Sequence, residues 1–119
     1  MEAERRKFRR LLAQDLTFAV LRPHFTNLGK VKDISEGGLA FEYILNETQN
    51  PASTEIDIFV SGNRFYLPRI PCKIIYDMEI VEEYESVERR RCGLQFGALT
   101  KEQAAKLDFF LKNHTTGTA

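Results

Sequence analysis

Apolar and polar side chains alternate along much of the chain with a period of two, which is typical of strands that bury one face. The stretches that show this pattern are 16–20, 25–34, 39–43, 56–60, 64–80 and 92–96. In the first stretch we expect Leu16, Phe18 and Val20 to face the core. In the longest stretch Pro68 and Pro71 indicate a sheet edge or a bend, because proline cannot donate to a strand ladder.

Glycines and polar segments predict how these strands connect. Gly29 lies inside a strand pattern, which indicates a bend or a bulge at that position. Gly37 and Gly38 predict a tight turn that pairs the strands on either side of it. The polar segments 46–53 and 82–85 are expected to be exposed loops.

The end of the chain has the spacing of a helix. Thr100 and Gln103 fit a capping box. One apolar stripe follows, made of Ala104, Leu107, Phe110 and Leu111. We expect Phe109 and Phe110 to belong to the core and the helix face rather than to a partner groove, and the small polar residues 114–119 to fray. The pattern as a whole predicts an all-β fold in which a barrel carries a single C-terminal helix.

Composition limits the chain to one domain and removes several classes of function. The chain has 119 residues, with 17 Lys plus Arg balanced by 17 Asp plus Glu, so no global field attracts nucleic acid or an anionic membrane. Cys72 and Cys92 form no disulfide framework, and His24 and His114 have no metal-ligand spacing, so no metal or cofactor is expected. No apolar run is long enough to span a membrane, and the basic N-terminus lacks the core of a secretory signal, so we expect a cytoplasmic protein.

Arginine residues near the N-terminus are the first candidate for ligand chemistry. Guanidinium groups donate in planar forks to phosphate oxygens and to the O6 and N7 edge of guanine. The cluster allows two registers of residues four apart, Arg6 with Arg10 or Arg5 with Arg9, and we favour the first. The alternative interpretation is a solvated basic tail.

A second candidate is the run that contains Asp33, Ser35, Gly37 and Gly38. A carboxylate can accept from N1 and N2 of guanine, and a hydroxyl can donate or accept. Ile34 would point into the core, whereas we expect Asp33 to be exposed. The alternative is an ordinary hairpin turn, in which the polar side chains satisfy local amides and the glycines supply positive φ.

Together the two motifs resemble those of the PilZ domain family, whose members carry an RxxxR arm followed by a DxSxxG turn. Here the motifs are Arg6-Lys7-Phe8-Arg9-Arg10 and Asp33-Ile34-Ser35-Glu36-Gly37-Gly38. The resemblance extends to Gly93-Leu94-Gln95-Phe96 and the closing helix. It implies a six-stranded antiparallel β-barrel over 15–99, after a basic arm at 1–14 and before a helix at 100–113.

The resemblance also implies a function, namely binding of the bacterial second messenger cyclic di-GMP by a regulatory receptor that relays the signal to a protein partner. Carried over by position, Arg6 and Arg10 hold phosphates and guanine, while Asp33, Ser35 and Gly38 meet the base. Arg5 precedes the favoured register, where arginine in the family goes with two bound ligands instead of one.

Other interpretations stay open at this point. Arg89, Arg90 and Arg91 could extend an anion site, but ion pairs with the acidic segment 82–88 are the simpler expectation. A small-barrel nucleic-acid binder is the main rival, although zero net charge argues against it. A barrel used only for protein contacts is a further alternative. An enzyme is not expected, because no nucleophile with a base, metal set or phosphate loop can be assembled.

Overall fold

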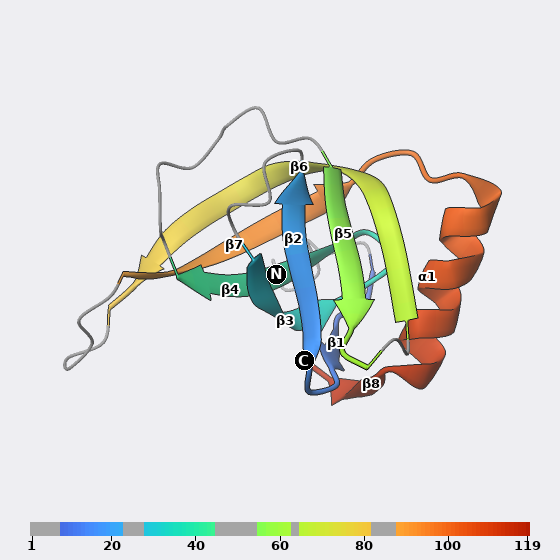
Figure 1. Cartoon of the computed structure of the whole chain (residues 1–119), viewed down its shortest axis with the longest axis horizontal. Coiled ribbons are helices and arrows are strands. Elements are labelled where there is room, and N and C mark those ends of the chain that lie inside the picture. Colours follow the sequence, from blue (N-terminus) through green and yellow to red (C-terminus); the bar gives the residue numbers. More distant parts are fainter. Residues whose placement is uncertain (1–7, 23–27, 45–54, 63–64, 82–87) are drawn as a thin grey trace, which may run out of the picture.

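The computed structural model describes residues 8–22, 28–44, 55–62, 65–81 and 88–119. Its elements are β1 (Leu11–Ala13), β2 (Thr17–Arg22), β3 (Leu28–Ile34), β4 (Gly38–Ile44), β5 (Glu55–Val60), β6 (Phe65–Ile80), β7 (Arg89–Phe96), α1 (Lys101–Asn113) and β8 (Thr115–Thr118). The loops expected at 46–53 and 82–85 fall outside these residues. Figure 1 shows the strands wrapped around one another, with α1 beside β6 and β5.

Six strands form a closed antiparallel barrel, as the sequence predicts. They are hydrogen-bonded in the order β2, β5, β6, β7, β4, β3, and a pairing between β2 and β3 closes the ring. The long strand β6 serves two neighbours, since its first half pairs with β5 and its second half with β7. The first half also contains the expected bend, because the β5–β6 register shifts beside Pro68 and Arg69 has a φ of 59°.

A short ribbon extends the barrel beside β3. Strand β1 lies between β3 and β8, with Leu12 opposite Asp33 and Leu11 opposite Thr118. The expectation that residues 114–119 fray is therefore wrong. Their small polar side chains bury little surface, but the backbone is held in place: the amide of Gln14 donates to the His114 carbonyl at 2.9 Å.

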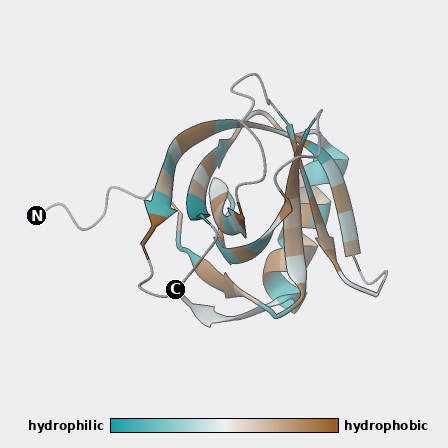
Figure 2. Cartoon of the chain, turned by 60° about the vertical axis from the view of Figure 1, so that its left-hand side comes forward, coloured by the Kyte–Doolittle hydropathy of each residue, from teal (hydrophilic) through white to brown (hydrophobic). Residues whose placement is uncertain are grey.

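The inner faces of the strands form one core. Leu39 and Phe41 of β4 and Ile56 and Ile58 of β5 are 0% exposed, as the alternation predicts. Figure 2 shows the strands curving around this interior, with hydrophobic and hydrophilic positions interleaved along them.

The predicted inward face of β2 is wrong. Thr17, Ala19 and Leu21 face the core at 0–2% exposure, whereas Leu16 is 57% exposed; Val20, on the other face, is also buried at 8% exposure. Both faces of β2 carry apolar side chains, and Phe18 packs outside the core against a neighbouring aromatic ring, so the pattern alone could not select the face.

The irregularity predicted at Gly29 lies elsewhere in β3. The register with β4 shifts between Val31 and Asp33, and Gly29 itself is regularly paired with Tyr43. Gly29 is required for a different reason: a Cβ there would lie 2.3 Å from the carbonyl oxygen of Glu42. The bulge instead lies immediately before Asp33, which places it beside the residue of greatest functional interest.

Helix α1 begins with the predicted capping box. Of its predicted apolar stripe, Leu107, Phe110 and Leu111 pack on the barrel, whereas Ala104 is exposed. The Thr100 hydroxyl accepts from the Gln103 amide at 3.0 Å, and Phe110 is 0% exposed. Phe109 is 52% exposed and stacks on Phe65, so it lies on the helix face outside the core. In the described parts of the chain, no helix is long and apolar enough to cross a membrane.

Candidate functional site

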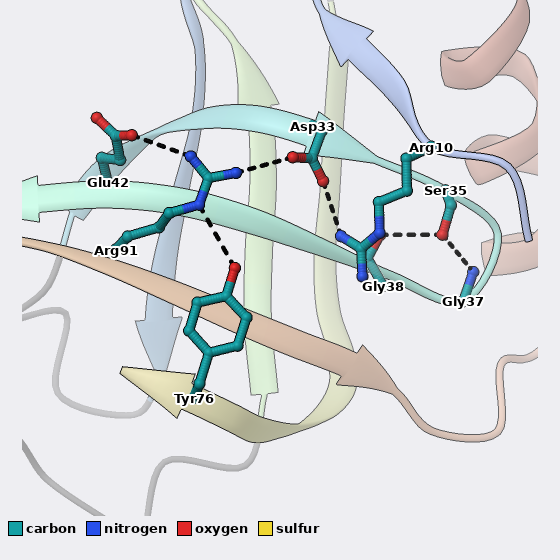
Figure 3. A network of polar contacts seen from close by, with 8 residues as sticks. All are labelled: Arg10, Asp33, Ser35, Gly37, Gly38, Glu42, Tyr76 and Arg91. Atoms are coloured by element: carbon teal, nitrogen blue, oxygen red, sulfur yellow. Dashed lines mark hydrogen bonds and ion pairs between the residues drawn. The ribbon is translucent and has the colours of Figure 1, made fainter. Parts of the chain in front are cut away.

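The two candidate motifs meet on the outer face of the barrel. Arg10 precedes β1 and Asp33 is near the end of β3, and the pairing of these two strands brings the side chains together. Nη1 of Arg10 donates to Oδ1 of Asp33 at 2.7 Å (Figure 3). A residue of the predicted arm therefore contacts the residue that opens the predicted turn.

Ser35 organises the turn between β3 and β4. Its amide donates to the Gly38 carbonyl at 2.8 Å, and its hydroxyl oxygen accepts from the Gly37 amide at 3.1 Å. These are the local hydrogen bonds that the hairpin interpretation predicts. Ser35 is 4% exposed, so in this structure its hydroxyl stabilises the turn from within.

The two glycines of the turn make close contacts and do not have the positive φ that the hairpin interpretation expects. In the part of the chain that the structure describes, the glycines with positive φ are Gly62 and Gly117. A Cβ on Gly38 would lie 2.1 Å from the Leu94 carbonyl oxygen, and a Cβ on Gly37 would lie 2.6 Å from the ring of Phe8. Close approach to the β7 backbone therefore explains Gly38, whereas Gly37 contacts only the side chain of Phe8.

Asp33 is more enclosed than the sequence predicts. Its residue exposure is 7%, where we expected an exposed carboxylate. Two arginines cover it, because Oδ1 accepts from Arg10 and Oδ2 accepts from Nη2 of Arg91 at 3.0 Å. A carboxylate this enclosed is stable as an anion only with such partners.

Arg91 is a residue of this cluster that the motifs do not contain. Its Nη1 donates to Oε2 of Glu42 at 3.1 Å, and its Nε lies 3.4 Å from the hydroxyl of Tyr76 (Figure 3). Burial disfavours the charged guanidinium, but hydrogen bonding to Tyr76 and the two nearby carboxylates outweigh this and raise the pKa of Arg91. The sequence feature that could have identified Arg91 is the alternation of side chains in β7, which puts Arg89 and Arg91 on one face.

The expected ion pairs of the late arginines can be followed only at Glu88, because residues 82–87 lie outside the described part of the chain. Arg90 contacts Glu88 and also Asp77. Arg89 and Arg91 each pair with Glu42 of β4. The reason is the sheet register, which places Arg91 directly opposite Glu42.

Two small residues lie between Asp33 and Tyr76 on neighbouring strands. Asp33 pairs with Ala40, Ala40 with Gly93, and Gly93 with Tyr76, so these four residues cross β3, β4, β7 and β6 in one row. A Cβ on Gly93 would lie 2.2 Å from the Tyr76 ring, so the ring lies directly over that glycine. Ala40 is 1% exposed and Gly93 is buried, so side chains already cover this row beside the charged cluster.

The remaining candidate residues are placed as follows. Nη2 of Arg9 donates to the Thr118 hydroxyl at 2.9 Å, so Arg9 is directed to β8 and Arg10 to Asp33. Which register of arginines binds the ligand stays a prediction. Arg5 and Arg6 lie outside the described residues, and their roles stay predictions.

Other parts of the described chain offer less specific chemistry. The described residues contain no group of three or more His, Cys, Asp or Glu side chains that could hold a metal ion. A groove of about 960 Å³ lies between α1 and the β5–β6 region, lined mainly by apolar residues that include Phe59, Phe65 and Phe109. It holds none of the motif residues, so the charged cluster around Asp33 is the better candidate for an anionic ligand.

Comparison with known proteins places these features in a family. The PilZ domain model matches residues 4–113. Two solved structures resemble the chain: YcgR in complex with c-di-GMP from Escherichia coli (TM-score 0.63, 16% identity, 91% of this chain) and the PilZ domain with c-di-GMP of YcgR from Escherichia coli (TM-score 0.58, 13% identity, 92% of this chain).

The extent of these matches limits what they show. The chain spans 45% of the first structure and 91% of the second. At such identities the structures show a common fold. No curated protein sequence gives a significant match. The family model covers nearly the whole chain, including both motifs and the closing helix, and the chain therefore belongs to the PilZ domain family.

Proposed function

We propose that this chain is a receptor that binds cyclic di-GMP on the outer face of its barrel, around Arg10, Asp33, Ser35 and Gly38. The observation that carries the proposal is the 2.7 Å contact between Arg10 and Asp33 beside the Ser35–Gly38 turn. It joins the two motifs that the sequence separates by more than twenty residues. Both solved structures that resemble the chain contain c-di-GMP, which supports the same ligand here.

The chemistry of the ligand matches the chemistry of the cluster. Cyclic di-GMP offers phosphate oxygens and guanine acceptors to a guanidinium, and the N1 and N2 donors of guanine to a carboxylate. A ligand that supplies both can replace the contact between Arg10 and Asp33 without leaving either charge unpaired. This matters because removing a partner from an enclosed charge is destabilising unless another group replaces it.

Individual roles follow from the motif positions. Arg6 and Arg10 hold phosphates and guanine, Asp33 accepts from the base, and Ser35 and Gly38 set the turn against which the base lies. Arg5, Arg9 and Gly37 contribute less directly. The module relays the bound state to a protein partner in the bacterial cytoplasm, and its function is binding, with no bond made or broken.

Isothermal titration calorimetry of the purified protein with cyclic di-GMP tests the proposal, with GTP and cyclic di-AMP as controls. We expect saturable binding of cyclic di-GMP alone. Arg10→Ala and Asp33→Asn should each weaken it by about 1.5 to 3 kcal/mol, the usual contribution of one charge-assisted contact. Asn is chosen at position 33 because it keeps the shape of this enclosed side chain, and a thermal melt of each variant checks the fold.

The stoichiometry follows from Arg5. Two intercalated ligands present more guanine faces and phosphates than one, so an additional guanidinium has a group to stack on and to neutralise. We expect two ligands per chain at saturation and a value closer to one in Arg5→Leu. Saturation of the unaltered protein at one ligand would mean either that Arg5 points to solvent or that the working pair is Arg5 with Arg9.

A further inference from the structure

Arg91 donates to two carboxylates and lies beside a hydroxyl, and the three groups come from three different strands. Nη2 bonds to Asp33 of β3 at 3.0 Å and Nη1 to Glu42 of β4 at 3.1 Å, while Nε faces the Tyr76 hydroxyl of β6 at 3.4 Å. We infer that Arg91 is a positioning residue, which holds the Asp33 carboxylate in place for the ligand. This inference rests on the proposed function, because Arg91 affects ligand binding only through Asp33.

The two arginines that contact Asp33 differ in how firmly they are held. Arg91 lies within β7, where its backbone position is paired with Glu42 on one side and with Met78 on the other. Arg10 precedes β1 and its carbonyl accepts from the Ala119 amide at 3.0 Å, but among the described residues its side chain donates to Asp33 alone, whereas that of Arg91 contacts three groups. We therefore expect Arg10 to leave Asp33 and contact the ligand, and Arg91 to keep its contact with Asp33.

A partner that stays is needed because of the enclosure of Asp33. The Asp33 side chain is 10% exposed, so little water can replace a lost arginine. When Arg10 turns to the ligand, Arg91 keeps one charge-assisted bond to Oδ2. Oδ1 is then free to accept from the ligand, and the carboxylate keeps its orientation.

The shape of the guanidinium is part of this role. Its donors point in fixed directions within one plane, so contacts to Asp33, Glu42 and Tyr76 define the orientation of the whole group. A lysine would carry the same charge as a single flexible point and could not hold both carboxylates in this geometry. The charge and the planar shape of the guanidinium therefore contribute separately to the position of Asp33. Arg91→Lys removes the planar shape alone, whereas Arg91→Met removes both.

A double-mutant cycle measured by calorimetry with cyclic di-GMP tests the inference. We expect Arg91→Met to raise the Kd about tenfold or more and Arg91→Lys to give an intermediate Kd. In an Asp33→Asn background, Arg91→Met should change the Kd by less than about twofold, because the residue through which Arg91 acts has been altered. Arg89→Met is the matched control, since Arg89 lies on the same face of β7 and donates to Glu42 at 3.1 Å. We expect the Kd of the Arg89→Met protein to differ from that of the unaltered protein by less than about twofold.

Each other outcome has a defined meaning. If the losses from Arg91→Met and Asp33→Asn multiply, Arg91 contacts the ligand itself and the positioning role is overturned. An unchanged Kd in Arg91→Lys, or an equal loss in Arg89→Met, also overturns it. If Arg91→Met fails to fold, Arg91→Lys in both backgrounds completes the cycle. If the unaltered protein binds no cyclic di-GMP, both the proposed function and this inference fail. If the unaltered protein binds tightly but the losses from Arg91→Met and Asp33→Asn multiply, the proposed function stands and only this inference fails.

Discussion

A methyl group at Gly38 should destabilise the barrel even without ligand. A Cβ there would lie 2.1 Å from the Leu94 carbonyl oxygen and 3.3 Å from the Gln95 Cα, all backbone of β7. Real Cβ contacts stay beyond 3.0 Å, so β4 and β7 must separate by about 1 Å at this point. Overpacking of this kind costs about 1–3 kcal/mol, and a strained hydrogen bond adds about 1 kcal/mol. We therefore expect Gly38→Ala to lower the free energy of unfolding by about 2–4 kcal/mol.

The adjacent glycine provides the matched control. A Cβ on Gly37 would lie 2.6 Å from the ring of Phe8, which is a side chain that is 38% exposed and can rotate away. Gly37→Ala should therefore cost less than about 1 kcal/mol. In thermal melts by circular dichroism the expected decrease in Tm is roughly 8–15 °C for Gly38→Ala and below about 4 °C for Gly37→Ala. A Gly38→Ala protein that melts within about 2 °C of the unaltered one would refute the argument from close approach.

Three further predictions concern the core, a buried ion pair and the thiols. Leu94→Ala should lower the free energy of unfolding in urea by about 2–5 kcal/mol, whereas Val81→Ala, at an 85% exposed site, should change it by less than about 0.5 kcal/mol; equal effects would mean that the final strand is misassigned. Asp57 is 2% exposed and accepts from the Arg22 guanidinium at 2.8 Å, so Asp57→Ala should cost about 3 kcal/mol in the same assay, and a loss below about 1 kcal/mol would contradict this. Burial raises the pKa of Cys72 to about 11 and that of Cys92 to about 12, so at pH 8 both thiols should react with DTNB far more slowly in the folded protein than in urea; rapid labelling of folded protein would contradict the burial. Because these raised pKa values keep the folded thiols protonated while the unfolded thiols ionise, their contribution to stability should be fully present below about pH 9 and be lost as the pH rises toward 11 to 12.

Local patterns predicted much of the fold. Alternation in β4 and β5 identified the inward residues correctly, and the capping box located the start of α1. The same logic failed for β2, where both faces are apolar. It also failed for β8, whose order comes from backbone pairing with β1 and is independent of side-chain type. The pattern of apolar side chains in a sequence predicts which residues are buried, but it does not predict backbone hydrogen bonds between strands that are far apart in the sequence.

The candidate site could be predicted only as far as its motifs extend. Asp33, Ser35 and the two glycines belong to one turn, so their proximity follows from short-range sequence. The enclosure of Asp33 depends on Arg91, which is fifty-eight residues away in the sequence and reaches it through the β4–β7 register. Alternation in β7 could place Arg91 on a face, but the identity of the facing residue requires the order of strands.

Mapping the ligand onto the protein tests the central claim most directly. We propose to titrate isotopically labelled protein with cyclic di-GMP and to follow the backbone amide signals by NMR. We expect the largest shifts at Arg10, Asp33, Ser35 and Gly38, with little change along the outer face of α1 at Phe109. Shifts concentrated around Phe109 and the apolar groove, with the Asp33 turn unaffected, would contradict it.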